Sequence, residues 1–442
     1  MQHKNFSLDT ILNNLNIESL NPMQTESIEA HEQHKNIVLL SDTGSGKTLA
    51  FLLPIIEQLN PENKKTQALI IVPSRELAMQ IEKVFKSLGT GFKITCCYGG
   101  HLRETEENNL IQPPAVIVGT PGRLADHIRR ENITTNTITF LVLDEFDKSL
   151  ELGFTDEVSF IVKSLPNLDR RTLTSATEAV EVPAFLGLHA PHKINNLSEE
   201  GQIVDGLAIK VLHSEDTDKI DALFNLLCYF GARSTIVFCN HRESVERCSK
   251  LLTDKGIYNE FYHGAMEQQE RDSALCKFRN GSTDVLITTD LAARGLDIPN
   301  IRYIVHYHLP HTEDIFTHRN GRTARMDASG TAILILSSEE KMPEYIDADV
   351  EEINLPESSP LPERPKWSTV FIAAGKKDKV NKVDIVGFLA QKGQLKKEDI
   401  GLIEVKDFSS FVAIRKNKLG AALELIKHER IKNKKVKIEV AK

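Results

Sequence analysis

Short apolar runs, separated by segments of helical length, recur along the first part of the chain. They fall at residues 36–40, 68–73, 115–121, 140–145 and 171–177. Between the runs, segments such as 74–88 carry apolar residues three and four positions apart, which is the spacing of one helix face. Strands that are apolar almost throughout, alternating with amphipathic helices, predict an α/β fold in which helices cover both faces of a parallel sheet.

The same pattern pauses in the polar stretch 195–206 and then restarts. Apolar runs return at 234–240, 259–264, 283–290, 302–310 and 330–336. A second α/β domain of similar size is therefore predicted. The two domains are expected to span residues 1–195 and 207–350.

The last part of the chain follows a different pattern. Residues 354–367 hold four prolines in fourteen positions, which predicts a stiff, extended linker over residues 351–366. Beyond it, the apolar pattern of residues 367–442 reads as strand, helix, strand, strand, helix, strand. This order predicts a small α+β domain of the RRM-like or ferredoxin-like class.

Composition fits an ordinary globular protein of several domains. The chain has 442 residues, of which 40% are hydrophobic and 26% are charged. No apolar stretch approaches the length needed to span a membrane, and the first residues lack the apolar core of a signal peptide. The six cysteines form no CxxC pair and show no metal-binding spacing with histidine. We expect reduced thiols, no membrane association and a cytoplasmic location.

Charge is distributed unevenly between the tail and the rest of the chain. Residues 366–442 contain 19 lysines and arginines against nine aspartates and glutamates, a net charge of +10. The remainder contains 35 against 53, a net charge of −18. A basic domain attached to an acidic body is typical of a nucleic-acid tether, whereas a solvated lysine-rich surface is the plainer alternative.

The segment SDTGSGKT, residues 41–48, lies between a predicted strand and a predicted helix. Such a loop cradles phosphates with backbone N–H groups at a helix N-terminus. Lys47 would reach the outer phosphates of ATP, and Thr48 would hold Mg²⁺. Ser41 stands where the general pattern has glycine, but only a small side chain is needed there. The expected ATP-binding residues of this loop are Ser41, Asp42, Thr43, Gly44, Ser45, Gly46, Lys47 and Thr48.

Three carboxylates crowd the end of the predicted strand that closes at Leu143. Asp144, Glu145 and Asp147 would repel one another in a buried position, so the segment is either a solvated acidic turn or a cation site. In the same parallel sheet, this strand end can face the phosphate loop. Asp144 would then bind Mg²⁺, partly through water, and Glu145 would orient and deprotonate the attacking water. The phosphate loop favours the cation site.

Further motifs lie in order around these two. In the first half they are Phe6 with NPMQ (21–24), PSRELA (73–78), GG (99–100), TPGR (120–123), DEFD (144–147) and SAT (175–177). In the second half they are IVFCN (236–240), QQER (268–271), TTDLAARGLD (288–297) and HRNGRTAR (318–325). With these motifs, residues 6 to about 340 resemble the DEAD-box family of RNA-dependent ATPases and helicases.

The resemblance implies two RecA-like domains that close over ATP and RNA. It implies that Phe6 stacks on adenine and Gln24 recognises it, and that Asp297 lies near the ribose. Arg322 and Arg325 would act as arginine fingers on the γ-phosphate. The residues expected to act on the reacting phosphates are Lys47, Glu145, Arg322 and Arg325.

The resemblance also assigns residues to coupling and to RNA. The residues expected to couple hydrolysis to strand separation are Asp147, Ser175, Ala176, Thr177 and His318. The core residues expected to contact RNA phosphates and 2′-hydroxyls are Pro73, Arg75, Gly99, Gly100, Thr120, Pro121, Gly122, Arg123, Gln268, Arg271, Thr289, Arg294 and Gly295. Contacts of this kind carry little sequence information.

Three positions depart from the family pattern. Phe146 replaces the small alanine between the acids, Asn16 stands at a usual glycine, and Ala324 lies in the last motif. Asn tolerates a left-handed backbone, so Asn16 is expected to be benign. The phenyl ring of Phe146 must find room either in the core or against the phosphate loop, which puts the turnover rate in question. An ATP-gated RNA clamp with weak hydrolysis is therefore an alternative to a helicase, and a DNA helicase is a second one.

Residues 368–440 resemble the DbpA-type RNA-binding domain that follows some bacterial DEAD-box cores. Its expected RNA-binding residues are Lys376, Lys377 and Lys379. Aligning DFSSFVAI on the RNP1 consensus keeps Phe411 but places Ser409 at a usual stacking aromatic, so binding through loops or helix ends is the alternative to base stacking. The resemblance implies a structured ribosomal RNA target, a role in ribosome assembly, precursor particles as partners and a monomeric enzyme. An RRM-like fold that docks protein is the competing interpretation.

Overall fold

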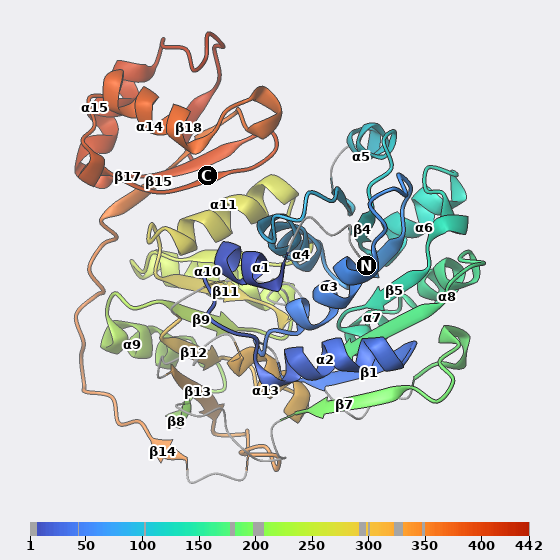
Figure 1. The fold of residues 1–442 in the computed structure, drawn as a ribbon. Helices are drawn as coiled ribbons and strands as arrows, with labels where there is room; N and C mark the ends of the chain where they lie inside the picture. Colours follow the sequence, from blue (N-terminus) through green and yellow to red (C-terminus); the bar gives the residue numbers. More distant parts are fainter. Residues whose placement is uncertain are drawn as a thin grey trace. The chain divides into compact units, whose positions relative to one another are not determined.

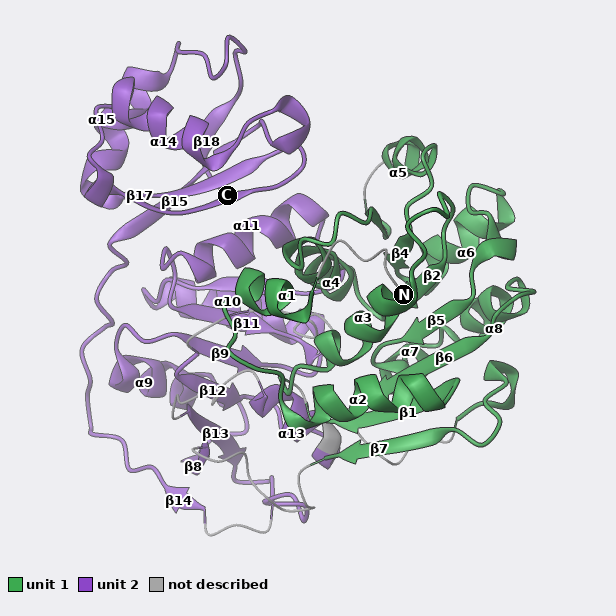
Figure 2. Ribbon diagram, in the orientation of Figure 1, with its two compact units in different colours: residues 1–202, 294–297 green, residues 203–293, 298–442 purple. Residues whose placement is uncertain are grey.

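The computed structural model describes most of the chain. The described residues are 7–42, 44–100, 103–176, 182–197, 207–290, 298, 301–321, 330–346 and 350–441. Those up to residue 197 fall in one compact unit, unit 1, and those from residue 207 onward fall in a second, unit 2 (Figure 2). Within these residues, every helix is too short or too polar to cross a membrane.

Unit 1 is built on a parallel sheet (Figure 1). Its described strands are β1 (Asn36–Ser41), β2 (Ala68–Ile71), β3 (Ile94–Cys97), β4 (Val116–Gly119), β5 (Phe140–Leu143), β6 (Arg170–Ser175) and β7 (His192–Asn196). Their order across the sheet is β3-β4-β2-β5-β6-β1-β7. Strands β2, β4 and β5 are buried at every position, as a parallel sheet with helices on both faces requires. The predicted RecA-like parallel-sheet class is confirmed.

Side chains point alternately to the two faces of the sheet along each strand, so each strand contributes to two apolar layers, one on each face. The helices of unit 1 are α1 (Leu8–Leu15), α2 (Pro22–Gln33), α3 (Lys47–Gln58), α4 (Arg75–Ser87), α5 (Arg103–Leu110), α6 (Pro121–Arg129), α7 (Phe146–Glu151) and α8 (Thr155–Lys163), with short 3₁₀ turns at Thr135–Thr137 and Ala184–Leu186. Ile70 of β2 packs with Phe51 of α3, whereas its neighbour Leu69 packs in the other layer with Leu124 of α6 and Ile161 of α8. Each fully buried side chain of this size contributes roughly 1.5–3 kcal/mol relative to an exposed one.

The edge strands of this sheet were not identified from the sequence. Strand β7 buries only Ile194, and its other residues are exposed or half-buried. Strand β3 at the opposite edge is four residues long and follows a glycine-rich turn. Edge strands contact a neighbour on one side only, so their sequences need not be apolar throughout, and the pattern that predicts central strands misses them.

Unit 2 contains a second parallel sheet. Its described strands are β8 (Leu207–Ser214), β9 (Thr235–Phe238), β10 (Glu260–Tyr262), β11 (Val285–Thr288), β12 (Tyr303–His306), β13 (Gly330–Ser337) and β14 (Glu351–Glu352), in the order β10-β11-β9-β12-β13-β8-β14. The described helices of this part are α9 (Ile220–Phe230), α10 (Arg242–Asp254), α11 (Gln268–Arg279) and α13 (Glu313–Asn320). Strand β14 lies inside the predicted linker and pairs with β8.

The C-terminal part of unit 2 forms an antiparallel sheet with two helices on one face. Its elements are β15 (Trp367–Ile372), α14 (Lys382–Gln391), β16 (Ile400–Val405), β17 (Ser410–Arg415), α15 (Lys416–Ile426) and β18 (Ile438–Val440), with 3₁₀ turns at Lys376–Asp378 and Lys397–Asp399. The strand order is β16-β17-β15-β18. The predicted βαββαβ order is confirmed, and Val370, Val412 and Ile385 lie in the core between sheet and helices.

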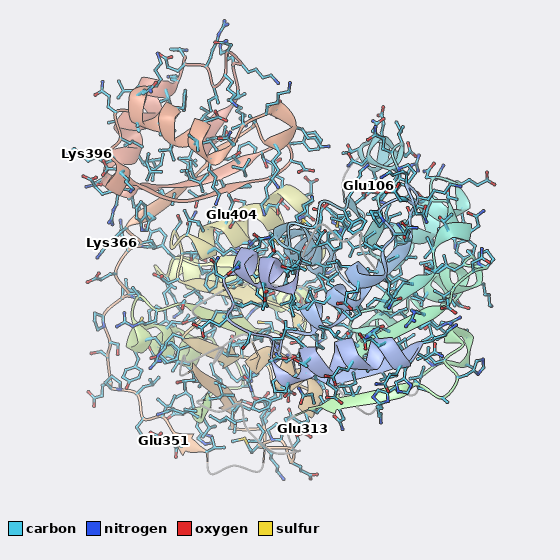
Figure 3. All side chains as sticks on the ribbon, viewed as in Figure 1. Glu106, Glu313, Glu351, Lys366, Lys396 and Glu404 are labelled. Atoms are coloured by element: carbon cyan, nitrogen blue, oxygen red, sulfur yellow. The ribbon has the colours of Figure 1, made fainter. Side chains whose placement is uncertain are left out.

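The other face of this C-terminal sheet packs on helix α11 of the same unit. Phe371 of β15 and Phe411 of β17 form an edge-to-face pair with ring centroids 5.6 Å apart, and both are buried with Cys276 of α11. Polar pairs surround this contact: Asn280 with Thr369 at 2.8 Å, Arg279 with Glu404 at 3.4 Å and Lys406 with Asp272 at 3.5 Å. Glu404 is labelled in Figure 3. The sheet face on which RRM domains usually stack bases therefore serves here as an internal interface.

A buried histidine ties strand β12 to helix α13 in unit 2. The Nε2 of His306 donates to Asn320 Oδ1 at 3.0 Å, and its Nδ1 faces the Arg319 guanidinium at 3.4 Å. Burial, and secondarily the Arg319 charge, lowers the pKa of His306 to about 3. The imidazole is therefore neutral in the folded protein at neutral pH.

We predict that this histidine makes unit 2 sensitive to acid. The folded pKa lies below the unfolded value of 6.5, so the unfolded state binds the extra proton and stability is lost as the pH falls from about 6.5 toward 3. Between pH 7 and pH 5 the loss is about 2 kcal/mol for this group. His306→Gln should remove that part of the pH dependence of urea unfolding, whatever its effect on absolute stability. His213→Gln, at an exposed histidine, is the control; equal acid sensitivity of His306→Gln and the wild type would contradict the assignment.

Candidate functional site

The central strands of unit 1 bring the predicted nucleotide residues to one edge of the sheet. Strands β5, β6 and β1 are neighbours and run parallel, so their carboxyl ends lie side by side. Ser41 ends β1 and leads into the phosphate loop, Asp144 follows β5, and Ser175 ends β6. The motifs that are far apart in the sequence therefore meet, as a parallel sheet predicts.

The phosphate loop has the backbone of an anion cradle. Gly46, at φ 93°, caps helix α3, and Lys47 is the first helical residue. The Lys47 ammonium donates to the carbonyl oxygens of Ser41 and Asp42, the latter at 2.8 Å, and burial lowers its pKa. Among the described residues, the buried hydroxyls of Ser41 and Ser45 have no hydrogen-bond partner. These polar groups at a helix N-terminus fit the phosphates of a nucleotide.

Two residues of helix α2 hold this loop in place. Asn21 and Gln24 form a reciprocal capping box, and Asn21 Nδ2 also donates to Ser45 O at 2.8 Å. Gln24 Nε2 donates to Gly46 O at 3.2 Å. The sequence analysis assigned Gln24 to adenine and missed its contact with the loop, although the Asn-Pro-x-Gln pattern is a recognisable helix start. Upstream, Asn16 ends helix α1 with left-handed angles of φ 57° and ψ 42°, as expected.

Two of the acids are fixed by one threonine that the sequence analysis missed. Thr174 of β6 donates its hydroxyl hydrogen to Asp144 Oδ1 and accepts the backbone N–H of Glu145 at 3.1 Å. Glu145 adopts φ 50°, a left-handed conformation that is strained for a side chain of this kind and is common at functional sites. Burial raises the pKa of Asp144, which fits a carboxylate placed to meet a cation. Carboxylate and hydroxyl oxygens are the ligands that Mg²⁺ prefers.

The third acid is buried beside a serine of β6 and a lysine of its own helix. Asp147, at the start of α7, lies near the side chain of Ser175, and burial raises its pKa. Lys148 lies 3.7 Å from Asp147 and 2.9 Å from Glu151. The neighbouring Phe146 is only 2% exposed and joins the apolar layer under the sheet, with Leu143 and Val158. The sequence analysis left two positions open for this ring, the core and the phosphate loop, and the ring lies in the core.

A second group of predicted residues lies where β2, β3 and β4 end. These strands are neighbours in the sheet, and they lead to Arg75, to Gly99–Gly100 and to the start of α6. Gly100 has φ 98°, and a side chain there would collide with the Arg75 guanidinium. Arg123 Nε donates to Tyr98 O at 3.3 Å. Two guanidinium groups therefore flank a glycine turn, an arrangement that suits a phosphate backbone. Of the other predicted residues here, Pro73 follows β2, Thr120 caps α6, and Pro121 and Gly122 begin that helix.

In unit 2 the described motifs are joined by Arg319, which the sequence analysis did not single out. Arg319 is 2% exposed and donates to Asp290 Oδ2 at 2.8 Å, His308 O at 2.6 Å and Asn240 Oδ1 at 2.8 Å. Asn240 and Asp290 belong to two of the predicted motifs, and His308 follows β12. Its neighbour His318 is also buried. The signal was available, because arginine recurs three times in HRNGRTAR.

The remaining predictions fall in different places. Arg271 of α11 is buried and donates to Tyr262 Oη at 2.8 Å, Gln268 contacts Asp272 on the same helix, and Thr289 follows β11. In the C-terminal domain Lys376, Lys377 and Lys379 are exposed, and Lys432 and Lys434 meet the same turn through Lys379 O and Asp378. The predicted residues that lie outside the described part of the chain are Phe6, Thr43, Thr177, Arg294, Gly295, Asp297, Arg322 and Arg325.

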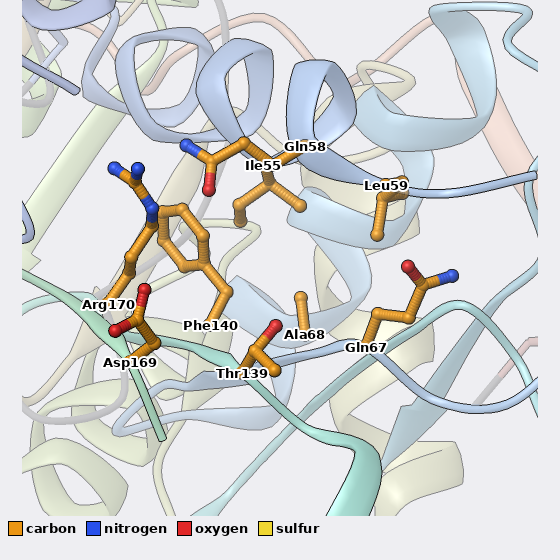
Figure 4. A pocket seen from close by; sticks show the side chains of 9 residues that line it. All are labelled: Ile55, Gln58, Leu59, Gln67, Ala68, Thr139, Phe140, Asp169 and Arg170. Atoms are coloured by element: carbon orange, nitrogen blue, oxygen red, sulfur yellow. The ribbon is translucent and has the colours of Figure 1, made fainter. Parts of the chain in front are cut away.

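A cavity of about 80 Å³ opens at the opposite, amino edge of the unit 1 sheet (Figure 4). Its lining comes from the end of α3 and from residues at the starts of β2, β5 and β6, and its polar side chains are those of Gln58, Gln67, Thr139, Asp169 and Arg170. The volume is far below the roughly 300 Å³ at which ligand pockets begin. The cavity is therefore not the nucleotide site.

Comparison with known proteins agrees with this geometry. Residues 21–184 match the DEAD/DEAH box helicase family, 218–327 match the helicase conserved C-terminal domain, and 369–440 match the DbpA RNA binding domain. The chain thus belongs to the DEAD-box family of ATP-dependent RNA helicases and carries a DbpA-type RNA-binding domain. It is an enzyme that binds ATP and RNA.

Individual relatives place it within that family. The ATP-dependent RNA helicase DbpA of Bacillus subtilis is 31% identical over 95% of this chain and 94% of its own length. The ATP-dependent rRNA helicase rrp3 of Aspergillus fumigatus is 38% identical over 71% of this chain and 67% of its own length. Dbp5 of S. cerevisiae bound to RNA and ADP BeF3 has a TM-score of 0.69 and 28% identity, covering 79% of this chain and 94% of that one.

We predict that Gly46→Ala weakens ATP binding by about tenfold or more. A left-handed alanine is strained by roughly 1–2 kcal/mol, and the added Cβ would lie 2.5 Å from Gln24 Nε2, so the loop loses its contact with α2. Titration with a fluorescent ATP analogue measures the effect. Gly91→Ala is the matched control, because Gly91 has φ 77° but open space around it. Equal loss of affinity in both variants would show that backbone strain alone is responsible.

Proposed function

We propose that the chain uses ATP hydrolysis, stimulated by RNA, to separate short RNA duplexes or to remodel RNA–protein complexes. The observation that carries the proposal is the meeting, on one edge of the unit 1 sheet, of the phosphate loop, the Asp144–Glu145 pair and the Arg75 and Arg123 turns. Strand ends β5, β6 and β1 supply the nucleotide groups, and β2, β3 and β4 supply the basic groups. The two sets lie on one continuous sheet, which provides a physical route for transmitting a movement of one set to the other.

Lys47 and the loop hydroxyls would bind the phosphates. On ATP binding the Lys47 ammonium exchanges the carbonyl oxygens of Ser41 and Asp42 for phosphate oxygens, which pair better with a buried cation. Thr48 and Asp144 would hold Mg²⁺, which neutralises charge on the phosphate oxygens. Thr174 keeps Asp144 aligned through its hydroxyl hydrogen bond.

Glu145 would act as the general base. Its carboxylate takes a proton from the attacking water, whose oxygen forms a bond to the γ-phosphorus while the bond to the bridging oxygen of ADP breaks. Glu145 lies at the N-cap of α7 with φ 50° and makes no side-chain capping hydrogen bond to that helix. From the family resemblance, Arg322 and Arg325 would stabilise the developing charge, and Phe6, Gln24 and Asp297 would hold the nucleoside.

We predict that Glu145→Gln lowers the RNA-stimulated ATPase rate at least about 100-fold and leaves ATP affinity within about twofold, because the amide keeps the shape but cannot accept the proton. Steady-state phosphate release and nucleotide titration measure the two quantities. Glu151→Gln, at a half-exposed carboxylate at the other end of α7, is the control and should stay near the wild-type rate. Hydrolysis unchanged in Glu145→Gln would remove Glu145 from the base role.

The tail would direct the enzyme to structured ribosomal RNA, in the cytoplasm and as a monomer, with ribosomal precursor particles as partners. Three observations support this: the DbpA RNA binding domain match, the rRNA helicase among the relatives and the net charge of +10 on residues 366–442. A role in ribosome assembly follows from that targeting. Exposed Lys376, Lys377 and Lys379 would contact the phosphates.

We predict that replacing Lys376, Lys377 and Lys379 by Gln raises the concentration of a ribosomal RNA hairpin needed for half-maximal ATPase stimulation about tenfold, because each lost phosphate contact weakens binding. Stimulation by unstructured single-stranded RNA should change less than about threefold. The matched control replaces Lys392, Lys396 and Lys397, three exposed lysines of the same domain, and should behave as wild type. Equal losses on both RNAs would reduce the tail to a general tether.

The same assay separates the two rival functions. ATP binding without hydrolysis on any nucleic acid would favour the RNA clamp, a rival that rested on Phe146. The ring of Phe146 lies in the core, which takes away the steric reason for that rival. Stimulation by single-stranded DNA equal to that by RNA would favour a DNA helicase.

A further inference from the structure

A buried charged cluster lies directly beneath the basic turns of unit 1. Glu106 of α5 is 1% exposed, and His127 of α6 and Cys97 at the end of β3 are fully buried. Glu106 is labelled in Figure 3. None of these three residues belongs to the ATP site or to the predicted RNA contacts. A carboxylate is very costly to bury unless several donors surround it.

Glu106 has such donors from both of the neighbouring turns. Its Oε1 accepts the backbone N–H of Tyr98 at 2.8 Å. Its Oε2 accepts from His127 Nε2 at 2.7 Å and lies 3.3 Å from Arg123 Nε. The Nδ1 of His127 accepts from Asn132 at 3.0 Å, which leaves the ring proton on Nε2, facing Glu106. One side chain therefore joins the strand end before Gly99–Gly100 to the first turns of α6.

We propose that Glu106, supported by His127, is a positioning residue for RNA binding, which fixes the Arg123 guanidinium and the Gly99–Gly100 turn in one rigid arrangement. The inference rests on the proposed RNA role of Arg123 and these glycines. Without the carboxylate, Arg123 loses the charged group that faces its guanidinium, and the Tyr98 N–H and His127 lose a buried partner. A mobile guanidinium must be ordered when RNA binds, and that cost appears as weaker RNA affinity.

A metal ion is the competing explanation for this cluster. One donor atom each from Cys97, Glu106 and His127 lie within 4.8 Å of one another, a set that could hold Zn²⁺. The Arg123 cation beside Glu106 opposes a second positive charge there, and the hydrogen bonds of His127 and Glu106 are complete as they stand. Burial also raises the pKa of the Cys97 thiol, so the thiolate that zinc needs is disfavoured. The hydrogen-bonded arrangement is therefore preferred.

The test is a double-mutant cycle in the full chain between Glu106→Ala and Arg123→Ala. We expect each single variant to raise the RNA concentration for half-maximal ATPase stimulation about tenfold, with the rate at saturating RNA and the KM for ATP within about twofold of wild type. The double variant should be less impaired than the two single effects combined would predict, because part of the effect of Glu106 passes through Arg123. If Glu106 had a purely structural role, Glu106→Ala would instead lower the rate at saturating RNA, the affinity for ATP and the thermal stability together.

Controls keep the interpretation clear. Glu107→Ala removes the adjacent carboxylate, which is partly exposed and pairs with Arg103 at 2.9 Å, and should leave RNA affinity unchanged. Glu106→Gln preserves side-chain volume and an acceptor for Tyr98, so it should lie between wild type and Glu106→Ala, and it replaces Glu106→Ala in the cycle should that variant fail to fold.

The outcomes separate this inference from the proposed function. An Arg123→Ala variant with wild-type RNA affinity would reject the RNA role of that turn. A normal response to Glu106→Ala, or strictly additive effects in the double variant, would overturn the positioning role while leaving the RNA role intact. Titration of Zn²⁺ into the wild type and into His127→Gln completes the test: one tight equivalent bound by the wild type and lost in the variant would overturn the proposal in favour of a metal site.

Discussion

Helices cover both faces of the parallel sheet of unit 1. Polar groups that take part in chemistry are therefore confined to the ends of the strands: the amino edge, where the strands begin, and the carboxyl edge, where they end. At the amino edge, Gln67 makes side-chain hydrogen bonds to neighbouring loop residues. The cavity at this edge is too small for a ligand. Within unit 1, the described candidate groups lie at the carboxyl edge. Because the strand order is β3-β4-β2-β5-β6-β1-β7, the three strands that lead to basic turns and the three that lead to the phosphate loop and acids form adjacent blocks. Neighbouring but separate sites are a consequence of that order.

Buried charges at these strand ends are held by partners from neighbouring strands or helices. Thr174 serves Asp144 from the adjacent strand, and Arg319 joins Asp290 to two further segments in unit 2. Such pairs cost free energy to desolvate, so they contribute little net stability, but they allow only one arrangement of the loops that carry them. Rigid loops of this kind suit catalysis and phosphate binding, since less motion has to be lost when the ligand arrives.

Sequence predicted the residues whose chemistry is local. The phosphate loop and the acids after β5 follow apolar strands within a few positions, so pattern and residue type identify them together. The glycine pair follows the missed strand β3 and was identified through the family resemblance alone. Their partners could not be found this way. Thr174 lies 30 residues from Asp144 and Arg319 lies 29 from Asp290, so each pairing exists only once the strand order is known. The sequence pattern also missed the edge strands β3 and β7, because a strand with a neighbour on one side only need not form a long apolar run.

In the C-terminal domain, the sheet face on which RRM domains usually bind bases is buried in an interface within unit 2. Phe371 and Phe411 occupy the sheet face that RRM domains offer to bases, yet both rings are buried against Cys276 with ion pairs at the rim, the pattern of a protein interface. Under the proposed function, the exposed lysines of this domain, such as Lys376, Lys377 and Lys379, would be the surface left to meet RNA. Lysines bind phosphates as point charges and read no bases, so discrimination between RNAs would come from the spacing of phosphates in a folded structure. A domain bound in this way would favour a shaped RNA over a flexible strand of the same charge.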